Sequence, residues 1–221
     1  MENKHMRSLV GTALLALCAI DGSAALAADT NCSASSPIAN GASVTGRVVV
    51  PDGQTCDITG VSVIGDVFVG KQATLKVHGG TVAGNVEANQ CTEVLLRGEA
   101  APLLIGGDVQ IRGCAGRLDY GSLWVAGFID GTAGRAMISG DVECVGNKGL
   151  CAVYRVDVGG NVRVDDTLAN GSPSQNTYSA NLTNNVIGKK LECNRNSPNP
   201  VTYGANVAAS GKLGQCAATG F

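Results

Sequence analysis

Three aspartates occupy the same place in a recurring phrase and are the strongest candidates for acid–base chemistry. Asp66, Asp108 and Asp141 each follow a glycine and precede a valine. Paired carboxylates about 6.5–9.5 Å apart can serve as general acid and general base on a glycosidic bond. If copies of the phrase stack at the interstrand spacing of about 4.8 Å, Asp66 and Asp108, two copies apart, are separated by about 9.6 Å. The spacing barely permits inverting glycoside hydrolysis.

A structural role for this row needs fewer assumptions. Asn85 and Asn161 occupy the same place in other copies of the phrase. Asp and Asn side chains before a strand accept hydrogen bonds from local backbone N–H groups and tolerate turn geometry. A calcium ion would need six to eight converging oxygens, and the sequence contains no dense acidic cluster. We therefore expect a structural row without metal or cofactor, and keep carbohydrate chemistry by Asp66, Asp108 and Asp141 as the alternative.

Other catalytic chemistries have less support. His78 is the single histidine outside the N-terminal segment and stands beside Gly79-Gly80. A lone histidine there is more often a turn residue than a base, and no Ser-His-Asp or Cys-His set can be assembled around it. The formal net charge is −2, without the clustered basic excess that nucleic-acid binding requires.

Aromatic residues offer a candidate binding surface. Trp124 stands between Leu123 and Val125, with Tyr120 and Phe128 at equal distances to either side in the sequence. If Leu123 and Val125 point inward, Trp124 points outward. Exposed aromatic side chains can stack on sugar rings or anchor a protein partner. Tyr120, Trp124 and Phe128 are therefore candidate binding residues, and burial under a loop is the alternative.

The elements that must position these residues repeat a short phrase. Its five clearest copies are Gly65–Val69, Gly84–Ala88, Gly107–Ile111, Gly140–Cys144 and Gly160–Val164. Short strands and glycine turns that recur at a period of about 20 residues are typical of a β-solenoid. We predict an all-β fold, a single right-handed parallel β-helix of about eight or nine turns. A β-sandwich is the alternative, but its strands recur every 8–12 residues or so without a fixed phrase.

Alternation along each strand assigns side chains to the two faces. The third and fifth residues of each phrase should point inward and stack: Val67, Val69, Val86, Ala88, Val109, Ile111, Val142, Cys144, Val162 and Val164. The residues between them should form an outward column of Phe68, Glu87, Gln110, Glu143, Arg163 and Glu192, with Trp124 if its turn keeps register. Glu143 and Arg163 should form an ion pair, and Asp165–Ser179 should be a loop.

The N-terminal segment, up to Ala27, has the features of a secretory signal peptide. Lys4 and Arg7 precede the apolar run Leu9–Ile20, and Ala25-Leu26-Ala27 resembles a cleavage site,. The run is too short for a membrane span. Lipid attachment at Cys18 is the alternative, but Leu17 stands where a small residue is expected. We predict one domain over residues 28–221, secreted or periplasmic, without a membrane span.

The eight cysteines of this domain should form disulfides. Exported proteins meet an oxidising compartment, and the sequence has no Cys-x-x-Cys metal motif. Residues one solenoid turn apart stack within the Cα separation of about 4.4–6.8 Å that a disulfide requires. Taken in order along the chain, the cysteines form four consecutive pairs. In three of these pairs the two cysteines are close to one repeat apart, and in the remaining pair, Cys144 and Cys151, they are nearer to each other. These spacings predict the pairs Cys32–Cys56, Cys91–Cys114, Cys144–Cys151 and Cys193–Cys216.

The repeat resembles the right-handed parallel β-helix of pectate-lyase-like proteins. More narrowly, the C-terminal stretch from Asn185 to Cys216 resembles a segment in secreted bacterial proteins of unassigned function, and departs from it at Lys189-Lys190, where a Gly-rich turn is expected. This resemblance implies an exported bacterial solenoid with a disulfide-closed end and implies no activity. The phrase also resembles that of the bactofilins, short β-helices that polymerise end to end. Those are cytoplasmic scaffolds without disulfides, so this resemblance concerns the repeat only.

Together these features predict an exported structural or surface-interaction solenoid without catalytic activity. Its expected partner is a polysaccharide or another cell-surface molecule, and a second copy of the chain is a further candidate. The alternative function is a carbohydrate-active β-helix that binds polysaccharide or cleaves glycosides with the acidic row.

Overall fold

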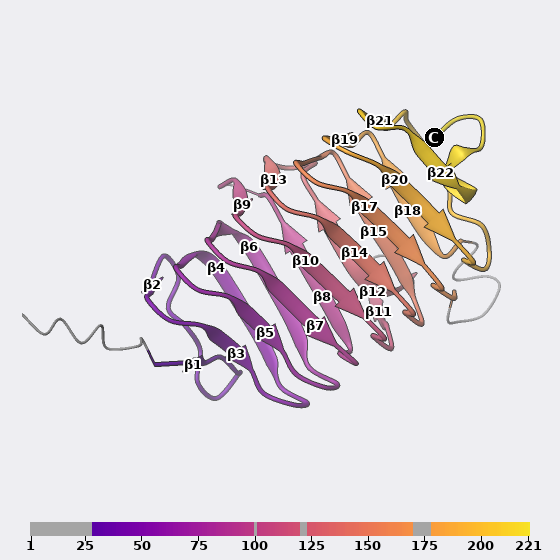
Figure 1. Ribbon diagram of the computed structural model, residues 1–221. Helices are drawn as coiled ribbons and strands as arrows, with labels where there is room; N and C mark the ends of the chain where they lie inside the picture. The colour runs from indigo at the N-terminus through magenta and orange to yellow at the C-terminus, as the bar shows by residue number, and fades with distance from the viewer. Residues whose placement is uncertain (1–27, 100, 120–122, 170–177) are drawn as a thin grey trace, which may run out of the picture.

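The computed structural model describes residues 28–99, 101–119, 123–169 and 178–221. In these residues the chain winds into an elongated stack of coils, with the N-terminal coils at one end and the C-terminal coils at the other (Figure 1). The strands of successive coils pair in parallel, so the molecule is an all-β solenoid as the repeat predicts. The candidate signal peptide, residues 1–27, lies outside the described ranges.

One sheet forms the first side of the solenoid, which we call face A. Its nine strands pair in the order in which the chain makes them, one strand from each coil. Their bounds are β1 Thr30–Asn31, β3 Val48–Val50, β5 Val67–Val69, β7 Val86–Asn89, β10 Val109–Arg112, β14 Val142–Val145, β17 Val162–Asp165, β20 Leu191–Asn194 and β22 Lys212–Gly214.

The second sheet has 13 strands and bends into two further sides, faces B and C. Strand β6 (Thr74–Val82) runs through both, because its first half pairs with β8 (Glu93–Arg97) and its second half with β9 (Leu103–Ile105). The parallel strand β4 (Thr55–Val63) does the same. Face B continues with β12 Leu123–Asp130, β15 Leu150–Tyr154 and β18 Ala180–Thr183, and the short β11 Arg117–Asp119 pairs antiparallel with β12. Face C comprises β2 Ser43–Val44, β9, β13 Ala136–Ile138, β16 Val156–Val158, β19 Val186–Ile187 and β21 Val207–Ala208.

The core runs along the inside of the stack. All ten residues predicted to point inward on face A are at most 4% exposed. The first of each pair form one column, in which Val67, Val86, Val109 and Val142 lie side by side in register. Each fully buried aliphatic side chain of this kind stabilises the fold by about 1.5–3 kcal/mol. Like residues thus stack on like residues in neighbouring coils.

The three corners between faces differ in length. Every strand of face C is followed by the same short connection to the next strand of face A, as between Val63 and Val67 or Ile138 and Val142. By contrast, β10 and β12 are separated by the stretch containing β11, and β17 ends at Asp165 while β18 begins at Ala180. The long excursions therefore lie between faces A and B. Residues 170–177 of the loop predicted at Asp165–Ser179 lie outside the described ranges.

Four disulfides join the same cysteines that the spacing predicts. The Cα–Cα distances are 5.3 Å for Cys32–Cys56, 4.5 Å for Cys91–Cys114, 6.4 Å for Cys144–Cys151 and 5.2 Å for Cys193–Cys216. Stacking one turn apart explains only Cys91–Cys114, which extends the register between Asn89 and Arg112.

The other three disulfides connect parts of the fold that do not stack. Cys32 follows β1 on face A, whereas Cys56 lies in β4 on face B. Likewise, Cys144 and Cys151 lie in β14 on face A and β15 on face B. Cys193 is in register with Gly214, so its partner Cys216 stands beyond the stacked position, in the short 3₁₀ helix Gln215–Ala217.

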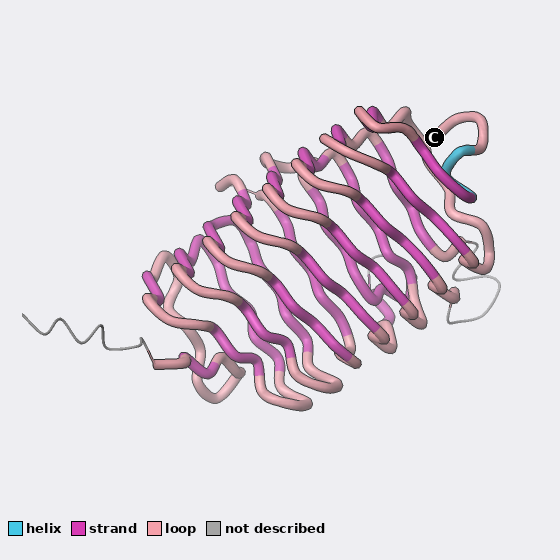
Figure 2. The backbone as a smooth tube through the Cα atoms, in the orientation of Figure 1, coloured by secondary structure: helices cyan, strands magenta, loops and turns pink. Residues whose placement is uncertain are grey.

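The 3₁₀ helix Gln215–Ala217 lies over the C-terminal end of the stack. Figure 2 shows it beside the last strands, while loops elsewhere occupy the corners. Cys216 is fully buried, and Phe221 packs against the core. The C-terminal end of the core is thereby covered. Within the described ranges no helix has the length and apolar character of a membrane span.

Candidate functional site

The candidate acidic row forms a hydrogen-bonded ladder at the corner between faces C and A. In five successive coils the side-chain Oδ1 atom of Asp or Asn accepts a hydrogen bond from the backbone N–H at the equivalent position of the next coil. The donors are Asn85 to Asp66 at 2.7 Å, Asp108 to Asn85 at 2.8 Å, Asp141 to Asp108 at 2.8 Å, Asn161 to Asp141 at 2.6 Å and Lys190 to Asn161 at 3.2 Å. The expected structural role therefore has non-local partners, one coil away, instead of local ones.

The ladder also explains the glycine before each Asp or Asn. A Cβ atom added at Gly84 or Gly107 would lie 2.2 Å from the Oδ1 atom of Asp66 or Asn85, and at Gly140 2.0 Å from that of Asp108. Separations below 3.0 Å force atoms to move, so only glycine fits beneath the ladder. The phrase Gly-Asp/Asn-Val thus has one physical cause for each position: space, an acceptor and a core side chain.

The number of residues between two aspartates of the acidic row does not give the number of coils between them. Asp108 and Asp141 are much more than one repeat apart in the sequence, yet they belong to neighbouring coils, because Val109 pairs with Val142. Asp66 and Asp108 are two coils apart with Asn85 between them, as expected. One oxygen of each aspartate is occupied by the ladder, which leaves the second carboxylate oxygen for other contacts.

The predicted outward column is present on face A. Phe68, Glu87, Gln110, Glu143, Arg163 and Glu192 are successive partners in the parallel register. Trp124 does not join it, because β12 belongs to face B. The excursion after β10 delays this strand, and the stretch after Gly121 is therefore not a face A strand. We call the six-residue column, with Asn89 and Arg112 beside it, the face A strip.

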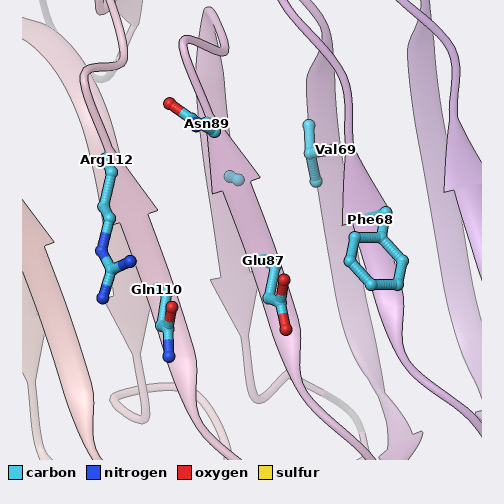
Figure 3. Close-up of a pocket in the computed structure, with 7 residues that line it drawn as sticks. Phe68, Val69, Glu87, Asn89, Gln110 and Arg112 are labelled. Atoms are coloured by element: carbon cyan, nitrogen blue, oxygen red, sulfur yellow. The ribbon is translucent and has the colours of Figure 1, made fainter.

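A shallow hollow lies at one end of the face A strip. Figure 3 shows Phe68, Glu87 and Gln110 projecting side by side from three neighbouring strands, with Asn89 and Arg112 further along. The hollow has a volume of about 160 Å³. The guanidinium carbon of Arg47 lies 5.2 Å from the centre of the Phe68 ring. The side chains of Glu87, Asn89, Gln110 and Arg112 thus lie around one edge of the Phe68 ring.

Arg47 is held in place by an ion pair. Its Nε and Nη2 atoms donate hydrogen bonds of 2.9 and 2.8 Å to the two carboxylate oxygens of Asp29. This hydrogen bonding lowers the pKa of the Asp29 carboxyl below its ordinary value. The bidentate contact restricts Arg47 and, through it, the neighbouring ring of Phe68.

A second hollow continues the strip toward the C-terminal end. It has a volume of about 230 Å³ and is lined by Glu143, Arg163 and Glu192 together with Asp141, Asn161 and Lys190. The predicted Glu143–Arg163 pair is replaced by two others: Glu143 bonds Arg112, and Arg163 donates to Asp165 at 2.6 Å. Arg112 and Asp165 lie two residues beyond the outward column in their strands and point to the same side. They therefore form these two contacts in place of the predicted pair.

The strip is suited to hydrogen bonding with an extended ligand. Its hollows of about 160 and 230 Å³ are smaller than the roughly 300–1,000 Å³ of enclosed small-molecule sites. Among the residues described, no group of three His, Cys, Asp or Glu side chains is placed to hold a metal ion. What the strip offers is a row of donors and acceptors on a rigid sheet.

The predicted aromatic patch falls partly outside the described residues. Tyr120 lies outside them, and for Trp124 only the backbone, in β12, is described. Phe128 is half-buried on face B, where its ring centre lies 5.3 Å from that of Tyr154. It packs with the buried Leu95, Leu150 and Ala152. Phe128 therefore contributes to a small outer hydrophobic cluster.

Three tyrosines that were not singled out in the sequence join this region. The ring centres of Tyr178 and Tyr203 are 6.5 Å apart in an edge-to-face arrangement. Burial raises the pKa of Tyr154 well above its ordinary value, and a hydrogen bond with the Asn181 side chain opposes the shift. Tyr154, Tyr178 and Tyr203 recur along the sequence at nearly equal intervals. Tyr154 is nevertheless in register with Thr183 and not with Tyr178, so the intervals do not correspond to coils and the sequence gives no direct signal for the three residues.

His78 is not in a turn. It lies within β6, with Nε2 3.4 Å from Asp57 Oδ1 and Nδ1 3.3 Å from Glu99 Oε2. Arg97 also contacts Glu99, at 2.7 Å. His78 therefore lies beside the carboxylates of Asp57 and Glu99 on face B. No serine or cysteine nucleophile is placed beside it by any described hydrogen bond.

Buried asparagines form a second structural device that the sequence analysis missed. The Asn147 amide accepts from the Cys114 N–H at 2.9 Å and donates to the Ile111 carbonyl at 3.0 Å, one coil earlier. Three further asparagines bridge an N–H and a carbonyl of an earlier coil in the same way: Asn185, Asn196 and Asn206. These side chains satisfy backbone groups that would otherwise be buried without partners.

Comparisons of the chain with protein-family models, with curated proteins and with solved structures found no match. A function must therefore be argued from the geometry of the described residues. The ladder accounts for the acidic row, whereas the face A strip is polar, regular and open to solvent along its hollows.

Proposed function

We propose that the protein is an exported interaction protein without catalytic activity, which binds an extended partner along the face A strip. The observation that carries this proposal is the ladder. Asp66, Asp108 and Asp141, the best candidates for acid–base catalysis, each use a side-chain oxygen to hold the next coil. A residue type that the fold itself requires at that place needs no further role.

Four disulfides support the exported part of the proposal. Thiols stay reduced in the cytosol, whereas secreted and periplasmic proteins retain disulfides. All eight cysteines of residues 28–221 are paired. The secreted or periplasmic location predicted from the N-terminal segment is consistent with this pairing.

A polysaccharide or a similar hydroxyl-rich cell-surface polymer suits the strip best. Hydroxyl groups accept hydrogen bonds from Arg112 and Gln110 and donate them to Glu87, while Phe68 provides an apolar edge,. Coils follow one another at about 4.8 Å, so a linear chain lying along the solenoid axis meets equivalent positions repeatedly. Three charged residues of the strip already have partners, Arg112 and Glu143 with each other and Arg163 with Asp165, which favours a neutral polymer.

A glycan screen with two readouts tests the proposal. Binding and release of reducing ends are measured on the same polysaccharides. We expect binding without release, and a loss of affinity of about tenfold when Glu87→Ala and Gln110→Ala are combined, since each lost hydrogen bond contributes about 0.5–1.5 kcal/mol. Leu104→Ala, on face C, is the control and should change nothing.

The opposite outcome is equally clear. Release of reducing ends that Asp66→Asn or Asp108→Asn abolishes, with the fold intact by circular dichroism, would favour the carbohydrate-active alternative. Binding that survives the face A double substitution would place the partner elsewhere on the molecule.

A further inference from the structure

Charge is distributed unevenly along the solenoid axis. From β18 to the C-terminus, residues 180–221 contain Lys189, Lys190, Arg195 and Lys212 against Glu192, a net charge of +3. The whole chain carries −2, so residues 1–179 carry −5. Arg195 is engaged with Asp166, and Lys212 donates to the backbone oxygen of Phe221. Lys189 and Lys190 are exposed.

Exposed apolar side chains gather in the same part of the molecule. Of the seven large apolar residues that are exposed in the described ranges, four lie in residues 180–221: Val186 at 54%, Tyr203 at 72%, Val207 at 62% and Leu213 at 41%. Val186 and Val207 are neighbours in the outward column of face C. The same column holds Ser43, Ser62 and Thr81 in the N-terminal coils and Leu104, Met137 and Asp157 in the middle coils. Asp157, one coil before Val186, pairs with Arg135. The column thus ends in two exposed valines on neighbouring coils.

The lysines and the apolar residues adjoin one another. Lys189 and Lys190 occupy the corner between faces C and A, shortly after Val186 and Ile187. In the preceding coils these two positions hold glycine and a ladder residue. Leu213 lies just across the corner on face A, in register with Glu192. The dilysine that interrupts the Gly-Asp/Asn phrase is thus flanked by exposed Val186 and Val207 on one side and Leu213 on the other.

We propose that this C-terminal end docks on an anionic lipid surface. Aliphatic and tyrosine side chains enter the interface between headgroups and acyl chains, while adjacent lysines attract anionic headgroups. A soluble polyanion would use the lysines and gain little from Val186, Val207 and Leu213. The negative charge of the remaining coils is repelled by such a surface, which orients the molecule on its C-terminal end. Face A then stays accessible, and the proposal does not depend on its ligand.

Vesicle co-sedimentation tests the proposal. The protein is recovered from producing cells, its N-terminus is read by mass spectrometry, and it is mixed with vesicles of phosphatidylcholine or of phosphatidylcholine with one third phosphatidylglycerol. We expect binding to the anionic vesicles alone, weakened by added salt. Lys189→Glu with Lys190→Glu should weaken binding by more than about tenfold, since one lysine near an anionic surface changes partitioning by about fivefold.

Matched variants separate lipid docking from other causes. Val207→Ser should weaken vesicle binding several-fold, whereas Ile64→Ser, a residue 58% exposed near the other end, should not. Lys71→Glu with Lys148→Glu is the charge control. All variants should unfold at the wild-type temperature, because these side chains are exposed.

Three results would overturn the proposal. They are equal binding to neutral vesicles, binding that the dilysine reversal leaves unchanged, and stronger binding to a soluble polyanion such as dextran sulfate with no effect of Val207→Ser. Glycan binding by the dilysine variant, measured in parallel, distinguishes this failure from a failure of the proposed function.

Discussion

The corner between faces C and A and the corner between faces A and B obey different rules. At the first, the connection from each strand of face C to the next strand of face A has the same length in every coil that the structure describes. At the second, β10 and β12 or β17 and β18 are separated by excursions. The ladder occupies the first corner and, among the described residues, has no continuous counterpart at the second. At the second, side chains such as Asp52, Asn147 and Asp165 bond a neighbouring coil singly. A continuous row of such side chains favours a constant corner length, whereas a corner with single links can lengthen.

Inserting two residues should give the largest difference in stability between the two corners. A Gly-Ser insertion after Gly106, at the corner of faces C and A, breaks the ladder to both neighbouring coils and should cost more than about 4 kcal/mol, an effect limited to severe structural lesions. The same insertion after Ala169, in the excursion between β17 and β18, should cost less than about 1 kcal/mol because loop length alone matters little. Denaturant unfolding without reductant measures both. Equal costs would show that the ladder does not set corner length.

Adding a single methyl group should give the next largest difference in stability between the two corners. Gly140→Ala places Cβ 2.0 Å from Asp108 Oδ1 and 2.7 Å from the Gly107 carbonyl oxygen, and we expect a loss of about 3 kcal/mol from overpacking. Gly146→Ala is the control. Gly146 has φ 66° and nothing within 4 Å of the added Cβ, so only the left-handed conformation is penalised, by about 1 kcal/mol. Thermal or denaturant unfolding gives the difference, which should vanish if the ladder is not needed.

Removing one acceptor tests the ladder directly. Asp108→Ala leaves the Asp141 N–H without its partner and should destabilise the protein by about 1–3 kcal/mol. Asp108→Asn keeps the acceptor oxygen, as Asn85 and Asn161 do in the native chain, and should change stability by less than about 0.5 kcal/mol. The measurement is the denaturant midpoint. Similar losses for the two variants would mean that charge, and not the hydrogen bond, holds the coils.

The corner between faces A and B offers a stabilising change. Gln72 adopts φ 56°, where the equivalent residue of the preceding coil, Gly53, has φ 68°. Gln72→Gly relieves the left-handed strain but increases the freedom of the unfolded chain, so we expect a net gain of at most about 1 kcal/mol. A rise in melting temperature would confirm it. A fall would show that the Gln72 side chain contributes more than its backbone conformation costs.

The smallest effect concerns pH at the same corner. The hydrogen bond from Arg195 lowers the pKa of Asp166 from its ordinary value of 3.8. A lowered folded-state pKa means that this pair stabilises the protein fully above the ordinary value, and that the contribution is lost as pH falls through the folded value. Arg195→Gln should therefore reduce stability slightly at neutral pH and not in strong acid. A constant difference over this range would contradict the assignment.

The repeated phrase predicted the fold because the same contacts with the neighbouring coils recur in each copy. Val67 and Val86 mark the core, and glycine with Asp or Asn marks the ladder, so counting residues was enough where coils are short. It failed where the chain makes excursions between faces A and B. The turn of Trp124 does not keep register for that reason, so this residue lies outside the outward column. The adjacency of Asp108 and Asp141 was concealed by the long excursion between them.

The candidate site was less predictable than the fold. The outward column followed from alternation, but the partners of Glu143 and Arg163 depend on neighbouring columns that one strand does not specify. The two hydrogen bonds of the Asn147 side chain need backbone groups of the preceding coil. No pattern within the coil of Asn147 indicates these contacts. The disulfide pairs were predicted correctly even though stacking one turn apart explains only Cys91–Cys114.

The placement of the outermost disulfides has a consequence for how the molecule comes apart. Coils in a solenoid touch only their neighbours, so fraying ordinarily starts at an end and travels inward. Here Cys32–Cys56 ties down the first coil and Cys193–Cys216 ties down the last. A protease or a pulling force that acts on either terminus meets a cross-link before it can unravel a single turn.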